Sequence, residues 1–495
     1  MYFDVAVIGA GAVGISVARH LADSGISVGL LEAGNGDTEN PREVIAHTVT
    51  NLGRHHQGVR QGWAVGPGGT TQLWGGQLWA WEDYEFRSRS YLRSSEWPIS
   101  SQDLRHYNEA FLHGIGAHPR IEDLLLGPTS SFENNPRLGP AYVKHSAWLP
   151  WRKRNFFRSG RHSLRRDARL KLLVGERVVG LEELGSERLT VALRSVSGVE
   201  SRLTCRMLIM AAGTLGNIRL IQRSGASQSP WLGRGFMDHV GGRYASFDVF
   251  DARRFMRSAG AKYVGTSLLT PRMVMHPEVA AKNELLNSFA HWAVALPAES
   301  GLYALREMLR AVQRRDPHAR SLRLLPRAIG GGTKEAVDAA YAMTALRRRP
   351  VPAGAKVHLQ VDVEQPPRYE SSVQWVRSGD SESLQVSWDI GAEERRSFDW
   401  LGSALLESLD LASLGLTNAA VESDPHLGDT YHMMGGTRIS QRIADGVVDN
   451  RQRIHGLANV MVAGASVFPT GGVANPTMTA AALALRAAST VIEEI

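Results

Sequence analysis

Residues 3–14 read FDVAVIGAGAVG, and this stretch decides the fold of the N-terminal part of the chain. It begins with a short apolar run, FDVAVI, which is typical of a buried parallel strand. Gly9, Gly11 and Gly14 then follow the G-x-G-x-x-G spacing, and VARHLADSG continues with the spacing of a helix. A glycine-rich turn between a buried strand and a helix predicts a βαβ unit that binds a dinucleotide.

The three glycines have separate tasks in such a unit. Gly9 permits the tight turn, Gly11 lets the backbone approach a pyrophosphate, and Gly14 lets the helix pack closely on the strand. The helix N-terminus then faces the phosphates. Glu32 ends the second strand, where a carboxylate accepts hydrogen bonds from ribose hydroxyls and repels a 2′-phosphate. The motif therefore disfavours NADP and leaves FAD and NAD open.

Composition is that of a soluble globular protein large enough for two domains, with 495 residues, 43% of them apolar and 21% charged. The net charge is +7, and the segment 304–349 is rich in Arg and Lys. We interpret this segment as a solvated helical face, and a membrane-surface or partner-docking patch is the alternative. No aromatic residues interleave with these basic ones as in a single-stranded nucleic-acid platform, so we expect no nucleic-acid partner.

The chain has one cysteine, Cys205, in an apolar run that predicts a buried side chain. A single cysteine excludes an intramolecular disulfide, cysteine-based zinc or iron–sulfur sites and a CxxCH haem site. We expect no metal. The start, MYFDVAVIGAG, has no signal-peptide pattern, and no uncharged run reaches the roughly 18 residues of a membrane span. These features favour a cytoplasmic enzyme.

Further along the chain, several segments have the patterns of strands. Residues 171–180 and 187–195 alternate like antiparallel strands, and 205–225 read as a buried strand, a turn and a helix. The latter unit lies far from the first βαβ unit, which predicts a discontinuous nucleotide domain. Three more segments predict a second, mostly antiparallel domain: 287–296, 356–365 and 383–390. The fold class is therefore α/β in the nucleotide domain and α+β overall.

Two other segments are candidates for ligand contact. Residues 66–77, GPGGTTQLWGGQ, can bring backbone N–H groups close to a ligand or form an ordinary surface loop. Near the C-terminus, His432 lies in YHMMGGT, and Asn475 and Pro476 precede the apolar segment TMTAAALALRAAS. Asn475 fits a helix N-cap and Pro476 the first helical position, so the pair can be purely structural. A helix that is apolar on nearly all sides also points its positive end into the protein, where it favours an anion.

Taken together, the motifs resemble those of the glucose–methanol–choline (GMC) oxidoreductases, which are FAD-dependent and mostly oxidise alcohols. The resemblance runs from end to end, and its C-terminal half is most similar to bacterial sugar and polyol dehydrogenases and pyranose oxidases. It rests on VIGAGAVG with Glu32, GGTTQLWGG, EWPIS, AAGTLGNIRL, LGRGFMDH (232–239), VEQPP (363–367), HMMGGT and VFPTGGVANPTMTAAALALRAA.

This resemblance implies a catalytic pair, His432 and Asn475, and FAD as the cofactor. It places the GGTTQLWGG loop against the flavin ring. Some pyranose oxidases attach FAD through a His at the position of Leu73, so FAD should be non-covalent here. The implied cofactor-binding residues are Gly9, Gly11, Ala12, Val13, Gly14, Glu32, Ala33, Gly69, Thr70, Thr71, Trp74, Gly75, Gly76, Val178, Ala212, Gly213, Gly464, Ala465, Pro476 and Thr477.

The implied reaction oxidises a sugar, cyclitol or glycoside hydroxyl to a carbonyl. His432 takes the hydroxyl proton, Asn475 binds the same oxygen, hydride passes to flavin N5, and the helix after Asn475 stabilises the reduced flavin. The partners are a small-molecule alcohol and oxygen or an external electron acceptor, while the oligomeric state stays open. The alternatives are a lipid or sterol alcohol oxidised at a membrane surface, and a non-redox FAD-containing lyase.

The expected organisation is discontinuous. Residues 1–90, 161–240 and 431–495 form three parts of the FAD-binding domain. Residues 91–160 form a linker with a helical segment on the substrate side. Residues 241–430 form the substrate-binding domain, in which the basic helical segment 300–350 is a possible cap.

Overall fold

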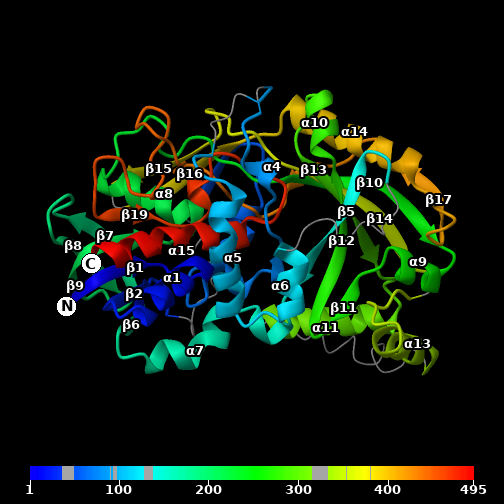
Figure 1. Ribbon diagram of the computed structural model, residues 1–495, viewed down its shortest axis with the longest axis horizontal. Helices are drawn as coiled ribbons and strands as arrows, with labels where there is room; N and C mark the ends of the chain where they lie inside the picture. Colours follow the sequence, from blue (N-terminus) through cyan, green and yellow to red (C-terminus); the bar gives the residue numbers. More distant parts are fainter. Residues whose placement is uncertain are drawn as a thin grey trace.

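The computed structural model has two sheet-centred halves (Figure 1). It describes residues 1–35, 49–89, 91–92, 97–126, 138–314, 333–352, 354–379 and 381–495. A mixed sheet with its helices lies at the left of Figure 1, where both chain ends lie, and a larger antiparallel sheet lies at the right. The expected fold class, a nucleotide-binding α/β half beside a mostly antiparallel half, is confirmed.

The mixed sheet is built around strand β1, which pairs in parallel with β2 on one side and β9 on the other. β6 and β19 extend this parallel part beyond β2 and β9, and the antiparallel strands β8 and β7 follow on the β9 side. The strands are β1 (Tyr2–Ile8), β2 (Val28–Glu32), β6 (Leu170–Val174), β7 (Glu176–Glu182), β8 (Leu189–Ser195), β9 (Glu200–Met210) and β19 (Val460–Val462).

This sheet draws its strands from three distant parts of the chain, as a discontinuous domain requires. The inner strands are buried on both faces, which accounts for their continuous apolar runs. Cys205 lies within β9 and is completely buried, and burial raises the pKa of its thiol to about 12. It is therefore an inert core side chain, as expected. The domain boundaries themselves stay a prediction.

One expected strand, 171–180, is in fact two. β6 ends at Val174 and β7 starts at Glu176, and the residue between them, Gly175, has a φ of +78°. Because that backbone conformation turns the chain, β6 pairs in parallel with β2 while β7 pairs antiparallel with β8. The alternation of apolar and polar residues continues across Gly175, so the sequence pattern did not predict the turn there.

Helices cover both faces of the mixed sheet. The long C-terminal helix α15 packs against α1 and α5, and its small side chains are buried on nearly every side, as expected. Ser100 caps α5 with a capping box, as its sequence position suggests. The helices and short 3-10 turns of this half are α1 (Ala12–Asp23), α3 (Gly58–Gln61), η1 (Gly69–Gln72), α4 (Asp83–Phe86), α5 (Ser101–Gly114), α6 (Pro119–Leu126), η3 (Trp151–Lys153), α7 (Phe156–Arg166), α8 (Gly213–Ser224), η5 (Ala465–Val467) and α15 (Pro476–Glu494).

The antiparallel sheet has the order β17-β10-β14-β13-β12-β5-β4, with β18 beside β10 and β11 beside β12. Its strands are β4 (Gln77–Leu78), β5 (Ala141–Trp148), β10 (Val240–Val249), β11 (Lys262–Val264), β12 (Ser267–Met275), β13 (Ser288–Ala295), β14 (Lys356–Val363), β17 (Leu416–Val421) and β18 (Gly428–Asp429). The expected strands at 287–296 and 356–365 are β13 and β14. The expected strand at 383–390 belongs to a separate small sheet of β15 (Ser372–Ser378), β16 (Ser381–Trp388) and β3 (Val49–Gly53).

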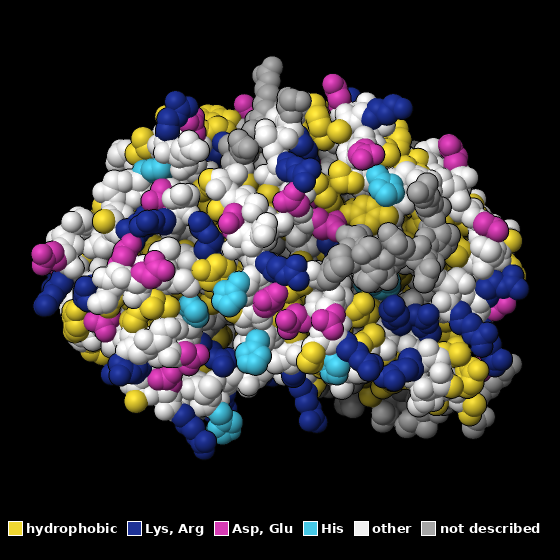
Figure 2. Space-filling view, in the orientation of Figure 1, with side chains coloured by type: hydrophobic (Ala, Val, Ile, Leu, Met, Phe, Trp, Pro, Cys, Tyr) yellow, Lys and Arg dark blue, Asp and Glu magenta, His cyan; other side chains and the backbone are white. Residues whose placement is uncertain are grey.

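The helices of this second half lie around the antiparallel sheet, and α14 contacts β10, β13 and β14. They are α9 (Ala252–Ser258), α10 (Pro277–Lys282), α11 (Gly301–Arg314), α13 (Thr333–Thr344) and α14 (Ala392–Ser408). Part of the basic segment 304–349 lies outside the described residues, which include its flanks in α11 and α13. Figure 2 shows Lys and Arg side chains near this end of the molecule.

Among the described helices, none combines the length and the apolar character that crossing a membrane would need. The cytoplasmic location stays a prediction.

Candidate active site

A cavity of about 340 Å³ lies at the carboxyl ends of β1, β2, β9 and β19. Ligands of parallel sheets bind at this edge. The residues that the sequence singled out and that line the cavity are Gly9, Gly11, Ala12, Val13, Glu32, Ala33, Gly69, Thr70, Thr71, Trp74, Val178, Ala212, Gly213, His432, Gly464, Ala465, Pro476 and Thr477. The structure thus brings eight separated segments to one cavity. Their contacts to a cofactor stay a prediction.

The turn between β1 and α1 has the geometry of a phosphate cradle. Gly9 has a φ of +101°, and an added Cβ would lie 2.5 Å from the Ala211 carbonyl oxygen. An added Cβ at Gly11 would meet only the Gly69 Cα, at 4.0 Å, so the space beside Gly11 is open. The first turn of α1 has no acidic residue and no capping side chain. Its free N–H groups and positive end suit the pyrophosphate of a dinucleotide.

Gly14, Gly75, Gly76 and Asn475 lie outside the cavity lining, and the three glycines make close packing contacts. A contact of these residues to a cofactor stays a prediction. A Cβ at Gly14 would lie 1.9 Å from the Gly9 carbonyl oxygen, which is the close helix–strand contact expected of this glycine. A Cβ at Gly75 would lie 2.3 Å from the Trp148 ring. Gly76 has a φ of +77°, and its carbonyl accepts a hydrogen bond from Leu149 N. The Trp-Gly-Gly turn therefore packs on β5 and the segment that follows it.

Glu32 lines the cavity, but its carboxylate already has backbone partners. Oε2 accepts a hydrogen bond from Ala10 N at 2.9 Å, and Oε1 accepts from Gly34 N at 3.0 Å and Gly66 N at 2.9 Å. Burial raises the pKa of Glu32, and these N–H donors act against that rise. Through these hydrogen bonds the Glu32 side chain links the three loops around the expected ribose position. Hydrogen bonding to a ribose stays a prediction.

Several lining residues carried no recognised signal in the sequence. Trp63 comes from a loop without a motif, and Arg223 lies on α8. Arg219, also on α8, lies within the AAGTLGNIRL segment of the family resemblance but was not chosen as a site residue, and Glu382 pairs with both arginines. Glu176 and Arg177 also line the cavity. They directly precede Val178, which the family resemblance marked as a cofactor-binding residue.

His432 and Asn475 meet although they are 43 residues apart. The Asn475 Nδ2 lies 2.8 Å from the His432 Nε2. Asn475 immediately precedes α15, but its side chain makes no capping hydrogen bond. The expectation that Asn475 caps the helix through its side chain is therefore wrong, because the amide is turned toward His432.

The loop before Asn475 is fixed by buried side chains from α4 and the residues around it. Glu85 Oε1 accepts hydrogen bonds from Val473 N at 2.7 Å and Ala474 N at 3.3 Å. Trp81 Nε1 donates to the Ala474 carbonyl oxygen at 3.1 Å. These hydrogen bonds to backbone N–H and C=O groups fix the segment that precedes Asn475.

The other ring nitrogen of His432 also has partners. His432 Nδ1 lies 3.0 Å from His239 Nδ1 and 3.0 Å from Thr430 Oγ1. Burial is the main reason that the pKa of His432 is lowered to about 4; His239 acts in the same direction, whereas Asp238 and Asp362 act to raise it. His432 is therefore neutral near pH 7 and can accept a proton.

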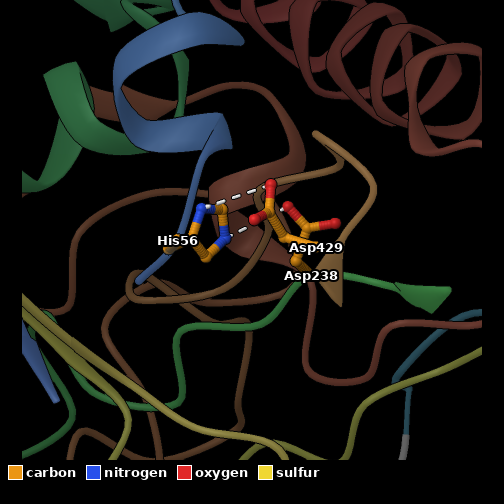
Figure 3. Close-up of side chains that lie close together, drawn as sticks. All are labelled: His56, Asp238 and Asp429. Atoms are coloured by element: carbon orange, nitrogen blue, oxygen red, sulfur yellow. Dashed lines mark ion pairs between the residues drawn. The ribbon is translucent and has the colours of Figure 1, made fainter. Parts of the chain in front are cut away.

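Figure 3 shows three side chains that lie close together, His56, Asp238 and Asp429, and Asp238 among them supports the backbone of His432. Asp238 Oδ1 accepts hydrogen bonds from His432 N at 2.9 Å and Thr430 N at 3.2 Å. His56 Nε2 lies 3.3 Å from Asp238 Oδ2, and His56 Nδ1 lies 3.6 Å from Asp429 Oδ2. Burial alone would raise the pKa of Asp238, but the hydrogen bond and charge of His56, with His432, lower it below its usual value.

The close approach of His56, Asp238 and Asp429, with one polar atom of each within 4.8 Å of the others, is also compatible with a metal ion. In the structure, backbone donors already bind Asp429, His56 Nδ1 and Asp238 Oδ1, whereas His56 Nε2 and Asp238 Oδ2 lie 3.3 Å from each other and have no other partner among the described residues. Val59 N donates to His56 Nδ1 at 3.3 Å, and Asp429 accepts from Gln57 N at 2.6 Å and Gly58 N at 2.8 Å. We therefore describe the three side chains as a hydrogen-bonded support. The absence of a metal stays a prediction.

The residues fit FAD. The cavity has an open, uncapped helix end for a pyrophosphate and free space at Gly11. Its lining runs from Glu32 and Val178 to His432 and Thr477, so an extended dinucleotide could span it. At the His432 end, a neutral imidazole and a primary amide converge, and such a pair can accept a proton from a hydroxyl while donating a hydrogen bond to its oxygen.

Two family models match segments of the chain that contain residues of this site. A family model described as "GMC oxidoreductase" matches residues 396–484, which include His432 and Asn475. A family model described as "FAD binding domain" matches residues 2–62, which include the glycine-rich turn and Glu32. The fructose dehydrogenase large subunit of Gluconobacter japonicus is 30% identical over 111 residues. That match spans 22% of this chain and only 20% of the relative's length.

Solved structures share the fold over nearly the whole chain. Pyridoxine 4-oxidase from Mesorbium loti has a TM-score of 0.59 at 16% identity, covering 99% of both chains. A fungal aryl-alcohol oxidase has a TM-score of 0.57 at 15% identity, again covering 99% of both. A formate oxidase variant (R554K) from Aspergillus oryzae has a TM-score of 0.59 at 16% identity, covering 100% of this chain and 98% of the other.

Proposed function

Because this chain belongs to the FAD-dependent GMC oxidoreductases, we propose that it oxidises an alcohol group of a sugar, cyclitol or glycoside to a carbonyl. The observation that carries the proposal is the 2.8 Å approach of His432 Nε2 and Asn475 Nδ2 beside the cavity that fits FAD. The similarity to a protein named fructose dehydrogenase large subunit supports a sugar hydroxyl as the reacting group.

In the proposed reaction, the substrate oxygen lies within hydrogen-bonding reach of both side chains. The O–H bond breaks and its proton passes to His432 Nε2, which is neutral because the pKa of His432 is lowered to about 4. Asn475 Nδ2 donates a hydrogen bond to the same oxygen and orients the adjacent C–H bond. FAD, when bound, supplies the acceptor for the hydride of that C–H bond, and the carbonyl forms as both bonds break.

The helix α15 has a further role in this proposal. It begins at Pro476, directly after Asn475, and Pro476 and Thr477 line the cavity. Its first turn holds no acidic side chain, so the positive end of the helix dipole faces the cavity unopposed by its own residues. Negative charge that develops in this part of the cavity would be stabilised there.

We also propose that FAD is held without a covalent bond. Leu73 stands where some relatives have a cofactor-attaching His, and a leucine side chain has no nucleophilic atom. Acid precipitation should therefore release the yellow cofactor into the supernatant. A flavin that stays with the precipitated protein would contradict this part of the proposal. The electron acceptor is oxygen or an external acceptor.

The first test is the visible spectrum of the purified protein before and after anaerobic addition of sugars, polyols and glycosides. Loss of the oxidised-flavin bands with one of these compounds would support the proposal and identify the substrate class. Return of the bands on admitting air would identify oxygen as the acceptor, whereas return only with an artificial acceptor would indicate a dehydrogenase.

Two results would contradict the sugar proposal. Bleaching only by sterol or lipid alcohols would redirect it to a lipid substrate. A flavin that no alcohol bleaches, in a protein that still binds FAD, would favour a non-redox lyase.

A further inference from the structure

We propose that His239 and Thr430 are positioning residues that hold His432 in the tautomer with its proton on Nδ1 and its lone pair on Nε2. This inference rests on the proposed function, in which His432 Nε2 is the base. The observation that leads to the inference is the 3.0 Å distance between His239 Nδ1 and His432 Nδ1. A hydrogen bond between two imidazoles needs one donor and one acceptor, so the two rings must hold their protons differently.

The far side of the His239 ring decides its own tautomer. His239 Nε2 lies 3.3 Å from the Gly471 carbonyl oxygen, which can only accept a hydrogen bond. His239 Nε2 therefore carries the proton. A neutral imidazole has only one N–H, so His239 Nδ1 is left as an acceptor that faces His432 Nδ1. The His239 side chain is 1% exposed, which keeps water from replacing this contact.

Thr430 leads to the same assignment by an independent route. Its Oγ1 lies 3.3 Å from Asp238 Oδ1, and a carboxylate accepts the hydroxyl proton. Burial opposes ionisation of Asp238, but its pKa is still lowered by His56 and His432, so the group is a carboxylate. The Thr430 oxygen lone pairs then face His432 Nδ1 at 3.0 Å. Two acceptors at Nδ1 place the proton of His432 there.

Asn475 completes the assignment from the substrate side. Its Nδ2 can only donate, and it lies 2.8 Å from His432 Nε2. A donor at Nε2 and two acceptors at Nδ1 are consistent with one tautomer only. The lone pair of His432 therefore points to the place where the substrate hydroxyl would bind.

The side chains of His56 and Asp238 keep Thr430 and His432 in this arrangement. Val59 N donates to His56 Nδ1 at 3.3 Å, so the proton of His56 lies on Nε2 and faces Asp238 Oδ2 at 3.3 Å. Asp238 Oδ1 in turn binds the backbone N–H groups of both Thr430 and His432. As Figure 3 shows, His56, Asp238 and Asp429 come from separate chain segments. The acceptor Thr430 and the base His432 are thus fixed by the same carboxylate.

The inference is tested by anaerobic flavin reduction in His239→Leu, His239→Asn and Thr430→Val variants. Leu removes the acceptor, whereas Asn places its Oδ1 near the position of His239 Nδ1. We expect the limiting reduction rate of His239→Leu to fall about 10–100-fold with little change in the substrate dependence, and His239→Asn to recover most of it. Thr430→Val should cause a smaller loss, because His239 Nδ1 remains as an acceptor for the proton on His432 Nδ1.

The pH dependence of the flavin reduction rate distinguishes a positioning role of His239 from a simple loss of structure. Apart from His239, the groups that act on the pKa of His432 are Arg272, which lowers it, and Asp238 and Asp362, which raise it. In the assigned tautomers His239 is neutral and accepts the proton on His432 Nδ1, a hydrogen bond whose strength depends on the protonation state of His432. Loss of this acceptor in His239→Leu should therefore shift the acid limb of the reduction rate, whereas His239→Asn, which keeps an acceptor, should leave the acid limb near that of the wild type. His358→Asn, in β14, is the matched control and should change neither rate nor profile.

The possible failures are distinguishable. Wild-type rates and an unmoved acid limb in His239→Leu, in a protein whose His432→Ala variant is slow, would overturn the inference and leave the proposed function intact. Equal losses in His239→Leu and His239→Asn with an unmoved acid limb and lower melting temperatures would also overturn it, because packing alone would then explain the effect. A wild-type flavin that no alcohol reduces would remove the proposed function itself.

Discussion

At His432, burial and neighbouring charges produce a base that is already deprotonated near pH 7. Because the pKa of His432 is lowered to about 4, a proton acceptor is present at every higher pH. We predict that His432→Ala retains FAD but slows anaerobic flavin reduction at least a hundredfold, in line with the roughly 10²–10⁴-fold effect of general bases. The measurement is stopped-flow absorbance with the best substrate of the panel. An unchanged reduction rate would exclude His432 from the proton transfer.

Asn475 and Ser100 form a matched pair for separating catalysis from helix capping. Ser100 accepts a hydrogen bond from Asp103 N at 3.4 Å and caps α5, whereas the Asn475 side chain caps nothing. We predict that Ser100→Ala loses about 0.5–2 kcal/mol of stability with normal flavin reduction. Asn475→Ala should show the reverse, a slow reduction and a nearly unchanged free energy of unfolding. Chemical denaturation and stopped-flow reduction of both variants would check this.

A normal reduction rate in Asn475→Ala together with a stability loss like that of Ser100→Ala would show that Asn475 acts only on the helix. The structure argues against this outcome because Asn475 Nδ2 lies 2.8 Å from His432 Nε2.

At the scale of elements, the glycine-rich turn between β1 and α1 contains two glycines with different tasks. Gly14 has no room for a side chain in the protein, because its Cβ would lie 1.9 Å from the Gly9 carbonyl oxygen. Gly11 does have room, because its Cβ would meet only the Gly69 Cα at 4.0 Å. A methyl group at Gly11 would therefore occupy space that the structure leaves open for a ligand.

We predict that Gly11→Ala folds with the thermal stability of the wild-type apoprotein but binds FAD at least tenfold more weakly, a loss of about 1.4 kcal/mol or more. Gly14→Ala should instead lower the melting temperature of the apoprotein. Fluorescence titration with FAD and thermal unfolding of the apoproteins would measure both effects. Wild-type FAD affinity in Gly11→Ala would place the pyrophosphate away from this turn.

At the scale of the whole molecule, Glu85 joins parts of the chain that are 388 residues apart. Its buried carboxylate accepts hydrogen bonds from Glu82 N at 2.8 Å and Val473 N at 2.7 Å. Burial, only partly opposed by Lys144 and these donors, raises the pKa of Glu85 from 4.5 to about 7. The folded protein therefore holds a proton that the unfolded chain releases between these two values.

We predict that this proton makes the folded state less stable as the pH rises from about 5 to about 8, because the unfolded state binds fewer protons over that range. Glu85→Gln keeps an acceptor for Val473 N but cannot ionise, so its stability should fall less over the same interval. Urea unfolding of both proteins at several pH values would show the difference. Parallel pH dependences would mean that Glu85 titrates normally.

Local signals in the sequence were sufficient for much of the fold and part of the site. The apolar run at 3–8, its three glycines and Glu32 gave the first βαβ unit, because buried strands and tight turns restrict the residues allowed at each position. The small residues after Pro476 gave the buried helix α15. Gly175 was missed because one glycine inside an alternating pattern does not show whether the chain continues or turns.

The sequence by itself determined the first βαβ unit and the buried helix α15, and through a family resemblance it indicated His432 and Asn475 as a pair. Only the tertiary structure decided that Asn475 turns away from its helix toward His432, and that His239, 193 residues from His432, lies against its other ring nitrogen. The physical reason is that periodicity records which face of an element is buried. The partner of a buried polar side chain depends instead on the order in which distant strands and loops assemble.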